Sequence, residues 1–146
     1  IFAILFMWTL WNKTVFGKNL FAVGGNPEAA RVSGVNVAKT ILTVYILSGV
    51  MYAIGGFLEA ARIGSATNNL GNMYEMDAIA ACVVGGVSFS GGVGKISGVV
   101  AGVIIFTLIN YGLTYIGVNP YWQYIIKGLI IITAVAIDVL KYRKSN

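Results

Sequence analysis

The side chains with catalytic potential are few, and Glu75 and Asp77 are the closest pair of carboxylates in the sequence. General acid–base catalysis needs two such groups directed at one substrate, but residues two positions apart lie on different faces of a helix. No nucleophile stands beside them, and the chain contains no histidine. Histidine-based catalysis and the usual zinc sites are excluded, so we expect a protein that is not an enzyme, with no catalytic residue, metal or cofactor.

Residues 92–95, Gly-Val-Gly-Lys, resemble the end of a phosphate-binding loop. That loop needs a glycine where Phe89 stands, and a serine or threonine where Ile96 follows the lysine. We therefore expect a tight turn between two helices here and no bound nucleotide.

Polar side chains within or beside apolar stretches are candidates for a solute pathway. Asn110 and Tyr111 fall in the middle of an uncharged stretch, where polar groups face either neighbouring helices or a water-filled cavity. Four more polar residues precede the apolar stretch that begins at Ala78, and they could line the outer mouth of a pathway. Asp77 could instead cap a helix beginning at Ala78. The candidate pathway residues are Asn68, Asn69, Tyr74, Asp77, Asn110 and Tyr111.

The composition excludes a water-soluble domain. Hydrophobic residues make up 58% of the chain and charged residues 10%, with a mean hydropathy of +0.82. Soluble domains carry about 25% charged residues. The cations are spread over several loops rather than gathered in a patch, so nucleic acid is not an expected partner. The sequence predicts an all-α, polytopic helical membrane protein in contact with the lipid bilayer.

Four apolar stretches approach the roughly 20 residues that a membrane-spanning helix needs: residues 40–58, 78–94, 96–117 and 121–140. The second is short and rich in glycine and serine, so a broken, tilted or re-entrant segment is an alternative to a full crossing. Residues 1–11 form half a span. Because the chain begins inside this run, we expect residues 1–146 to be one transmembrane domain, the C-terminal part of a longer protein, with four full transmembrane helices and a truncated one.

Lysine and arginine residues are concentrated in every second loop along the chain. Eight lie in the loops predicted for one side, whereas Arg62 alone lies on the other. The positive-inside rule makes the cation-rich side and the C-terminus cytoplasmic. Lys127 and Asp138 lie towards the ends of their span, where snorkelling explains a charge. The eight cations are Lys13, Lys18, Arg31, Lys39, Lys95, Lys141, Arg143 and Lys144.

Small residues predict close helix contacts. Gly94, Gly98 and Gly102 are spaced four apart in a ridge that runs into the predicted span 96–117, and Gly86 and Ser90 extend the spacing backwards. Such residues let helices approach closely in lipid. The spacing is compatible with packing inside a bundle, with a dimer seam or with a mobile helix.

A short polar segment on the cation-rich side has the signals of a capped helix. Asn26 is a favourable N-cap, Pro27 suits the first helical position, Glu28 complements the N-terminal end of the helix dipole, and Gly34 can end the helix. A rigid helix exposed on this face is a docking element.

Two motifs identify a family resemblance. Residues 24–36, Gly-Gly-Asn-Pro-Glu-Ala-Ala-Arg-Val-Ser-Gly-Val-Asn, resemble the cytoplasmic coupling segment of permeases of bacterial ABC sugar importers of the ribose and galactose type. Residues 74–81 followed by 85–94 resemble the second signature of the same family. Residues 110–124 are similar to the galactose-type members, and ribose or another sugar remains an alternative substrate.

The resemblance implies an all-helical permease in the bacterial inner membrane that pairs as a homodimer. It implies two ATP-binding subunits that dock on the coupling helices, a periplasmic sugar-binding protein, and sugar import by alternating access driven by ATP hydrolysis in the partner. A membrane scaffold that transports nothing is the alternative from another class. The residues that the resemblance assigns to the ATPase contact are Asn26, Pro27, Glu28, Ala29, Ala30, Arg31 and Gly34.

Overall fold

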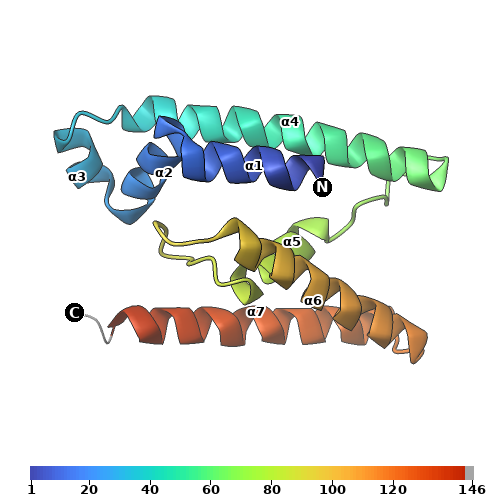
Figure 1. The fold of residues 1–146 in the computed structure, drawn as a ribbon. Helices are drawn as coiled ribbons and strands as arrows, with labels where there is room; N and C mark the ends of the chain where they lie inside the picture. The colour runs from blue at the N-terminus through green and yellow to red at the C-terminus, as the bar shows by residue number, and fades with distance from the viewer. Residues whose placement is uncertain (144–146) are drawn as a thin grey trace.

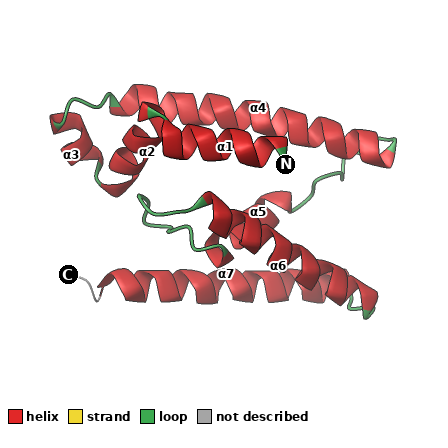
Figure 2. Ribbon diagram, viewed as in Figure 1, coloured by secondary structure: helices red, strands yellow, loops and turns green. Residues whose placement is uncertain are grey.

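The computed structural model describes residues 1–143, in which helices are joined by loops and no strand occurs (Figure 1, Figure 2). An all-α fold is therefore confirmed for the described chain. The helices, in order, are α1 (Phe2–Lys13), α2 (Val15–Gly25), α3 (Pro27–Val32), α4 (Val37–Ile63), α5 (Tyr74–Val84), α6 (Ile96–Tyr115) and α7 (Pro120–Arg143).

Within the described residues, three helices are long and apolar enough to cross a membrane: α4, α6 and α7. They contain 27, 20 and 24 residues, respectively. At 1.5 Å per residue, helices of this size are about 30–40 Å long, which matches or exceeds the roughly 30 Å of the hydrocarbon core. They coincide with the predicted spans 40–58, 96–117 and 121–140, which confirms a helical membrane fold.

The predicted span 78–94 is not one continuous helix. Helix α5 has 11 residues, which corresponds to about 16 Å, and it ends at Val84. Gly85 caps it, Gly86 has a φ of +83°, and residues 85–95 follow as a loop. Of the alternatives considered from the sequence, the broken segment is the one that the structure contains, and residues 1–143 include three rather than four full-length transmembrane helices.

Helix α2 was not predicted. It follows α1 after a single residue, Thr14, whose side chain accepts a hydrogen bond from the backbone N–H of Gly17 over 3.2 Å. A Cβ at Gly17 would overlap the carbonyl oxygen of Trp11, so only glycine permits this sharp turn between α1 and α2. The capping threonine and the glycine three residues later were the available sequence signals.

A small core joins α5, α6 and α7. Ala80 and Ala81 of α5 and Phe106 of α6 are buried, and Ile130 and Ile131 of α7 pack against them. In membranes, small residues permit this kind of close backbone approach.

The predicted packing glycines differ in their surroundings. A Cβ at Gly102 would overlap the carbonyl oxygen of Ala81, and a Cβ at Gly98 would overlap that of Gly85. A Cβ at Gly94 would lie 3.4 Å from the side chain of Val87, whereas one at Gly86 would meet nothing within 4 Å. Gly86 therefore supplies the positive φ of a turn, and Gly98 and Gly102 supply the helix contact.

Different helices and loops lie at the two ends of the molecule. Helix α3, the loop after α5 and the C-terminal end of α7 lie towards one end in Figure 1, and the end of α4 and the turn between α6 and α7 lie towards the other. Among the described helices, only α2 and α3 bring their backbones close to that of α4. Its apolar side chains, such as Leu42, Tyr45, Tyr52 and Phe57, are mostly exposed and face lipid or another protein.

Candidate coupling helix and solute pathway

Helix α3 is capped at its N-terminus in the way that the sequence predicts. The Asn26 side-chain oxygen accepts hydrogen bonds from the backbone N–H groups of Glu28 and Ala29, both over 3.0 Å. Pro27 occupies the first turn, where its missing N–H costs nothing. Asn26 also closes α2, because its backbone N–H donates to the carbonyl of Ala22. One residue thus ends one helix and begins the next.

The C-terminus of α3 is closed by a Schellman motif. The N–H of Gly34 donates to the carbonyl of Arg31, and the N–H of Val35 donates to the carbonyl of Ala30, both over 3.0 Å. Gly34 has a φ of +86°, which glycine adopts without strain. A helix of six residues is marginal by itself, so these two caps and the buried Ala30 hold α3 in place.

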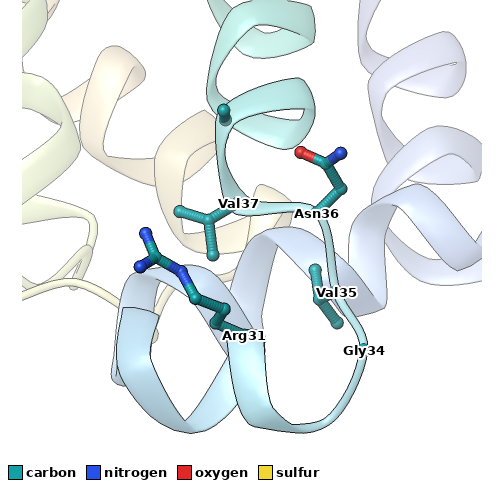
Figure 3. Close-up of a pocket in the computed structure, with 6 residues that line it drawn as sticks. Arg31, Gly34, Val35, Asn36 and Val37 are labelled. Carbon is teal, nitrogen blue, oxygen red and sulfur yellow. The ribbon is translucent and has the colours of Figure 1, made fainter.

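The outer surface of α3 is open. Glu28, Ala29 and Arg31 are exposed, and Val32 retains 90% of its accessible surface. Beside the helix lies an open hollow of about 400 Å³, lined by Arg31, Gly34, Val35, Asn36, Val37 and Ala38. Figure 3 shows the Arg31 side chain extending from α3 towards Val37, where α4 begins. An exposed apolar residue beside a guanidinium and an open hollow suits a protein surface that binds a partner.

The chain just before α3 contacts the loop that follows α5. A Cβ at Gly24 would lie 2.7 Å from the backbone nitrogen of Gly92, and a Cβ at Gly91 would overlap the carbonyl oxygen of Gly24. Gly91 and Gly92 both have positive φ. The two backbones therefore touch without intervening side chains, which places the loop containing Lys95 at the same end of the molecule as α3.

At the opposite end, polar side chains connect α4 and α5. Arg62 donates hydrogen bonds of 3.1 and 2.7 Å to the carboxylate of Glu59, and the Tyr74 hydroxyl donates to the same carboxylate over 3.1 Å. Tyr111 of α6 also interacts with Arg62. One predicted pathway residue, Tyr74, thus binds an ion pair that the sequence gave no reason to single out.

Asp77 forms an ion pair with Lys127, whose Nζ lies 2.6 Å from Asp77 Oδ1. The alternative that Asp77 caps its helix is wrong, because α5 begins at Tyr74 and Asp77 lies within its first turn. Glu75, two positions earlier, is exposed, as the spacing predicts. Snorkelling does not describe Lys127, whose side chain is only 13% exposed and pairs with another helix.

Two aromatic rings lie beside this ion pair, and one amide lies a helical turn from one of them. Lys127 Nζ is 5.9 Å from the ring centroids of both Phe106 and Tyr124, within the range of cation–π attraction. Asn110 follows Phe106 by one helical turn and therefore lies on the same side of α6. Its side-chain oxygen is buried and has no hydrogen-bond partner among the described residues.

The remaining predicted residues are less closely engaged. Asn68 and Asn69 are exposed in the loop between α4 and α5, outside the polar contacts described above. The side chains of Asp138, Lys141, Arg143 and Lys144 lie outside the described part of the structure. Within that part, no three carboxylates or thiols gather into a metal-binding group.

Comparison with known proteins identifies relatives over nearly the whole chain. A sequence profile described as the permease component of branched-chain amino acid transport systems matches residues 1–135. The galactose/methyl galactoside import permease protein MglC of Salmonella typhimurium is 77% identical over the whole chain, which covers 44% of that protein. The same-named protein of Treponema pallidum is 51% identical over 97% of the chain, which covers 27% of it.

A relative with another sugar in its name is more distant. The xylose transport system permease protein XylH of Escherichia coli is 45% identical over 91% of the chain, which covers 34% of that protein. The chain therefore spans less than half the length of these relatives. No solved structure matches it.

Proposed function

We propose that this chain is the membrane part of an ABC importer for galactose or methyl galactoside. The premise is that the chain belongs to the family described as the permease component of branched-chain amino acid transport systems. The observation that carries the proposal is a rigid, doubly capped and exposed helix, α3, in a chain 77% identical to a galactose import permease. A scaffold without transport has no need of such a helix.

In this proposal α3 is the docking helix of an ATP-binding subunit, and the contact residues are Asn26, Pro27, Glu28, Ala29, Ala30, Arg31 and Gly34. Force applied to α3 reaches α4 through four connecting residues and reaches the loop after α5 through Gly24. Reversing a 1:99 preference between two conformations requires about 5.5 kcal/mol of differential interaction. A well-packed interface on a rigid helix is a suitable source for that energy.

The proposed orientation places α3, Lys95 and the C-terminus on the cytoplasmic side of a bacterial inner membrane. The positive-inside rule supports it, as does the contact between Gly24 and the loop that precedes Lys95. The loop 64–73 and helix α5 together then return the chain across the membrane as a broken fourth crossing. A second permease copy and a periplasmic sugar-binding protein complete the proposed assembly.

Sugar is proposed to enter at the end where Glu59 and Arg62 lie. From there inwards it would pass Asn68, Asn69, Tyr74 and Tyr111, and then Asn110 and Asp77. Irregular backbone at membrane depth is tolerated only where protein buries it or where it lines a water-filled cavity. Residues 64–73 are mostly exposed, so in this proposal the loop lines the water-filled entrance of the pathway.

The test is ATP-driven uptake of labelled galactose by proteoliposomes containing the permease, its ATPase and its binding protein. We expect galactose uptake to be competed by methyl galactoside and not by ribose or xylose. Competition by ribose or xylose instead would assign another sugar, and the absence of ATP-dependent uptake of any of them would reject the importer function.

The role of α3 has its own test. Glu28→Arg places a positive charge at the N-terminal end of the helix dipole and on the proposed contact surface, so we expect sugar-stimulated ATP hydrolysis to fall while membrane insertion is retained. Glu28→Gln, which removes the charge without reversing it, is the control with a smaller loss. Wild-type hydrolysis and uptake in Glu28→Arg would remove α3 from the coupling mechanism.

A further inference from the structure

The ion pair between Asp77 and Lys127 lies well inside the membrane-spanning part of the molecule. Lys127 is the eighth residue of α7, which places it about 10 Å along the helix from Pro120. It is also the eighth residue of the 18-residue apolar segment of that helix. Ionisable side chains at such depth are costly, and they face the bundle interior or a water-filled cavity. This position calls for a reason beyond the stability of the bundle.

One buried oxygen in this part of the helix bundle, Asn110 Oδ1, has unused capacity to accept hydrogen bonds. Asn110 Oδ1 is buried and has no hydrogen-bond partner among the described residues, whereas the buried Asp77 Oδ1 has the Lys127 ammonium as its partner at 2.6 Å. Lys127 Nζ forms an ion pair with Asp77 Oδ1. An ammonium carries three N–H donors, so this one contact leaves others free to bind a further acceptor. A buried acceptor without a donor is costly, so the unpartnered Asn110 oxygen and the spare N–H groups of Lys127 favour a hydroxyl-bearing occupant.

The surroundings match the same chemistry. The rings of Phe106 and Tyr124 flank Lys127 and offer apolar faces beside the polar groups. A hollow of about 110 Å³ adjoins Lys127 and is lined by Met73, Met76, Tyr124, Gly128 and Ile131. A sugar ring would enter when α5 and α7 separate.

We propose that Lys127 and Asp77 form a binding station for sugar hydroxyl groups on the translocation pathway, with Asn110 as a third polar contact. In the closed arrangement the carboxylate and the ammonium neutralise each other. When α5 and α7 part, the carboxylate accepts hydrogen bonds from hydroxyl groups of the passing sugar, and the ammonium donates to others. The proposal rests on the proposed importer function and adds Lys127 on α7 as a residue that contacts the substrate.

The experiment measures galactose transported per ATP hydrolysed in proteoliposomes that contain the complete importer with its binding protein saturated by galactose. The variants are Asp77→Asn, Lys127→Met and the exchanged pair Asp77→Lys with Lys127→Asp. Glu75→Gln is the matched control, because Glu75 is an exposed carboxylate on the same helix. We expect the control to match the wild type and the single variants to transport at least tenfold less galactose per ATP.

The exchanged pair separates a binding station from a structural clamp. A clamp needs only opposite charges, so a return of galactose per ATP to the wild-type value in the exchanged pair would overturn the proposal. We expect this variant to regain thermal stability yet remain at least tenfold below the wild type, because donors and acceptors now face the wrong hydroxyls. Wild-type transport in the single variants would also overturn the proposal.

A second measurement keeps the proposal testable if a single variant fails to fold. Lys127→Arg preserves the charge and changes the donor geometry, so we expect it to alter the relative transport of galactose and its monodeoxy analogues; an unchanged ranking counts against a binding station. If wild-type proteoliposomes transport no galactose, the importer function itself is rejected and this inference with it.

Discussion

Replacing Asn26 with alanine tests whether the caps hold α3 together. The Asn26 side chain accepts two hydrogen bonds, from the N–H groups of Glu28 and Ala29, and the helix that they begin has only six residues. Loss of an asparagine N-cap costs about 0.5–2 kcal/mol. A tenfold change in an equilibrium corresponds to about 1.4 kcal/mol, so local opening of α3 should become roughly 2- to 30-fold more frequent.

Hydrogen–deuterium exchange of the membrane-embedded protein measures that opening directly. We expect exchange in the peptide covering α3 to accelerate within this range in Asn26→Ala, and Asn26→Asp, which keeps the acceptor oxygen, to retain most of the protection. Asn36→Ala is the matched control, because Asn36 caps the 27-residue α4 through one hydrogen bond to the N–H of Lys39 over 2.9 Å. Unchanged exchange in Asn26→Ala, or equal acceleration of α4 in the control, would refute the reasoning.

Two further predictions concern the helix contact and the orientation. Gly102→Ala should lower the melting temperature of the permease, because the added Cβ would overlap the carbonyl oxygen of Ala81 and overpacking costs about 1–3 kcal/mol. Gly112→Ala is the control in the same helix, where the added Cβ meets open space, so it should be neutral or slightly stabilising. Equal melting temperatures for the two would argue against the close α5–α6 contact. Ala29→Cys, in a background with Cys82 replaced by alanine, should react with an impermeant thiol reagent in inside-out vesicles and not in intact cells, and the reverse pattern would invert the proposed topology.

Local signals in the sequence were sufficient to predict α3. Asn26, Pro27 and Gly34 each act through hydrogen bonds or backbone angles within a few residues, so their effect does not depend on the rest of the fold. The long apolar helices α4, α6 and α7 were predictable for a similar reason, because their length and apolar character are properties of contiguous sequence.

Features that depend on distant contacts were not predictable from the sequence. Helix α5 ends where Gly85 approaches Gly98 on α6, and nothing near Val84 in the sequence specifies that neighbour. The partner of Lys127 is Asp77, fifty residues earlier, so its position in the sequence indicated only a charge within an apolar helix. The spacing of Asn110 and Tyr111 identified them as polar groups at depth, but it did not reveal that Tyr111 interacts with Arg62.

Direct contact of glycine backbones at residues 24 and 91–92 has a mechanical consequence. A side chain can change rotamer and absorb a displacement, but two abutting peptide groups cannot. Gly91 and Gly92 both have positive φ, so replacing them with residues whose side chains could separate the two backbones would be strained. Any shift of the chain that leads into α3 therefore moves the loop after α5 by a similar amount. Helix α4 meets α5 through the Tyr74–Glu59 hydrogen bond at the opposite end of the molecule. At the end where α3 is exposed, the glycine contact prevents the helices that precede it (α1–α4) and those around the loop (α5–α7) from moving independently.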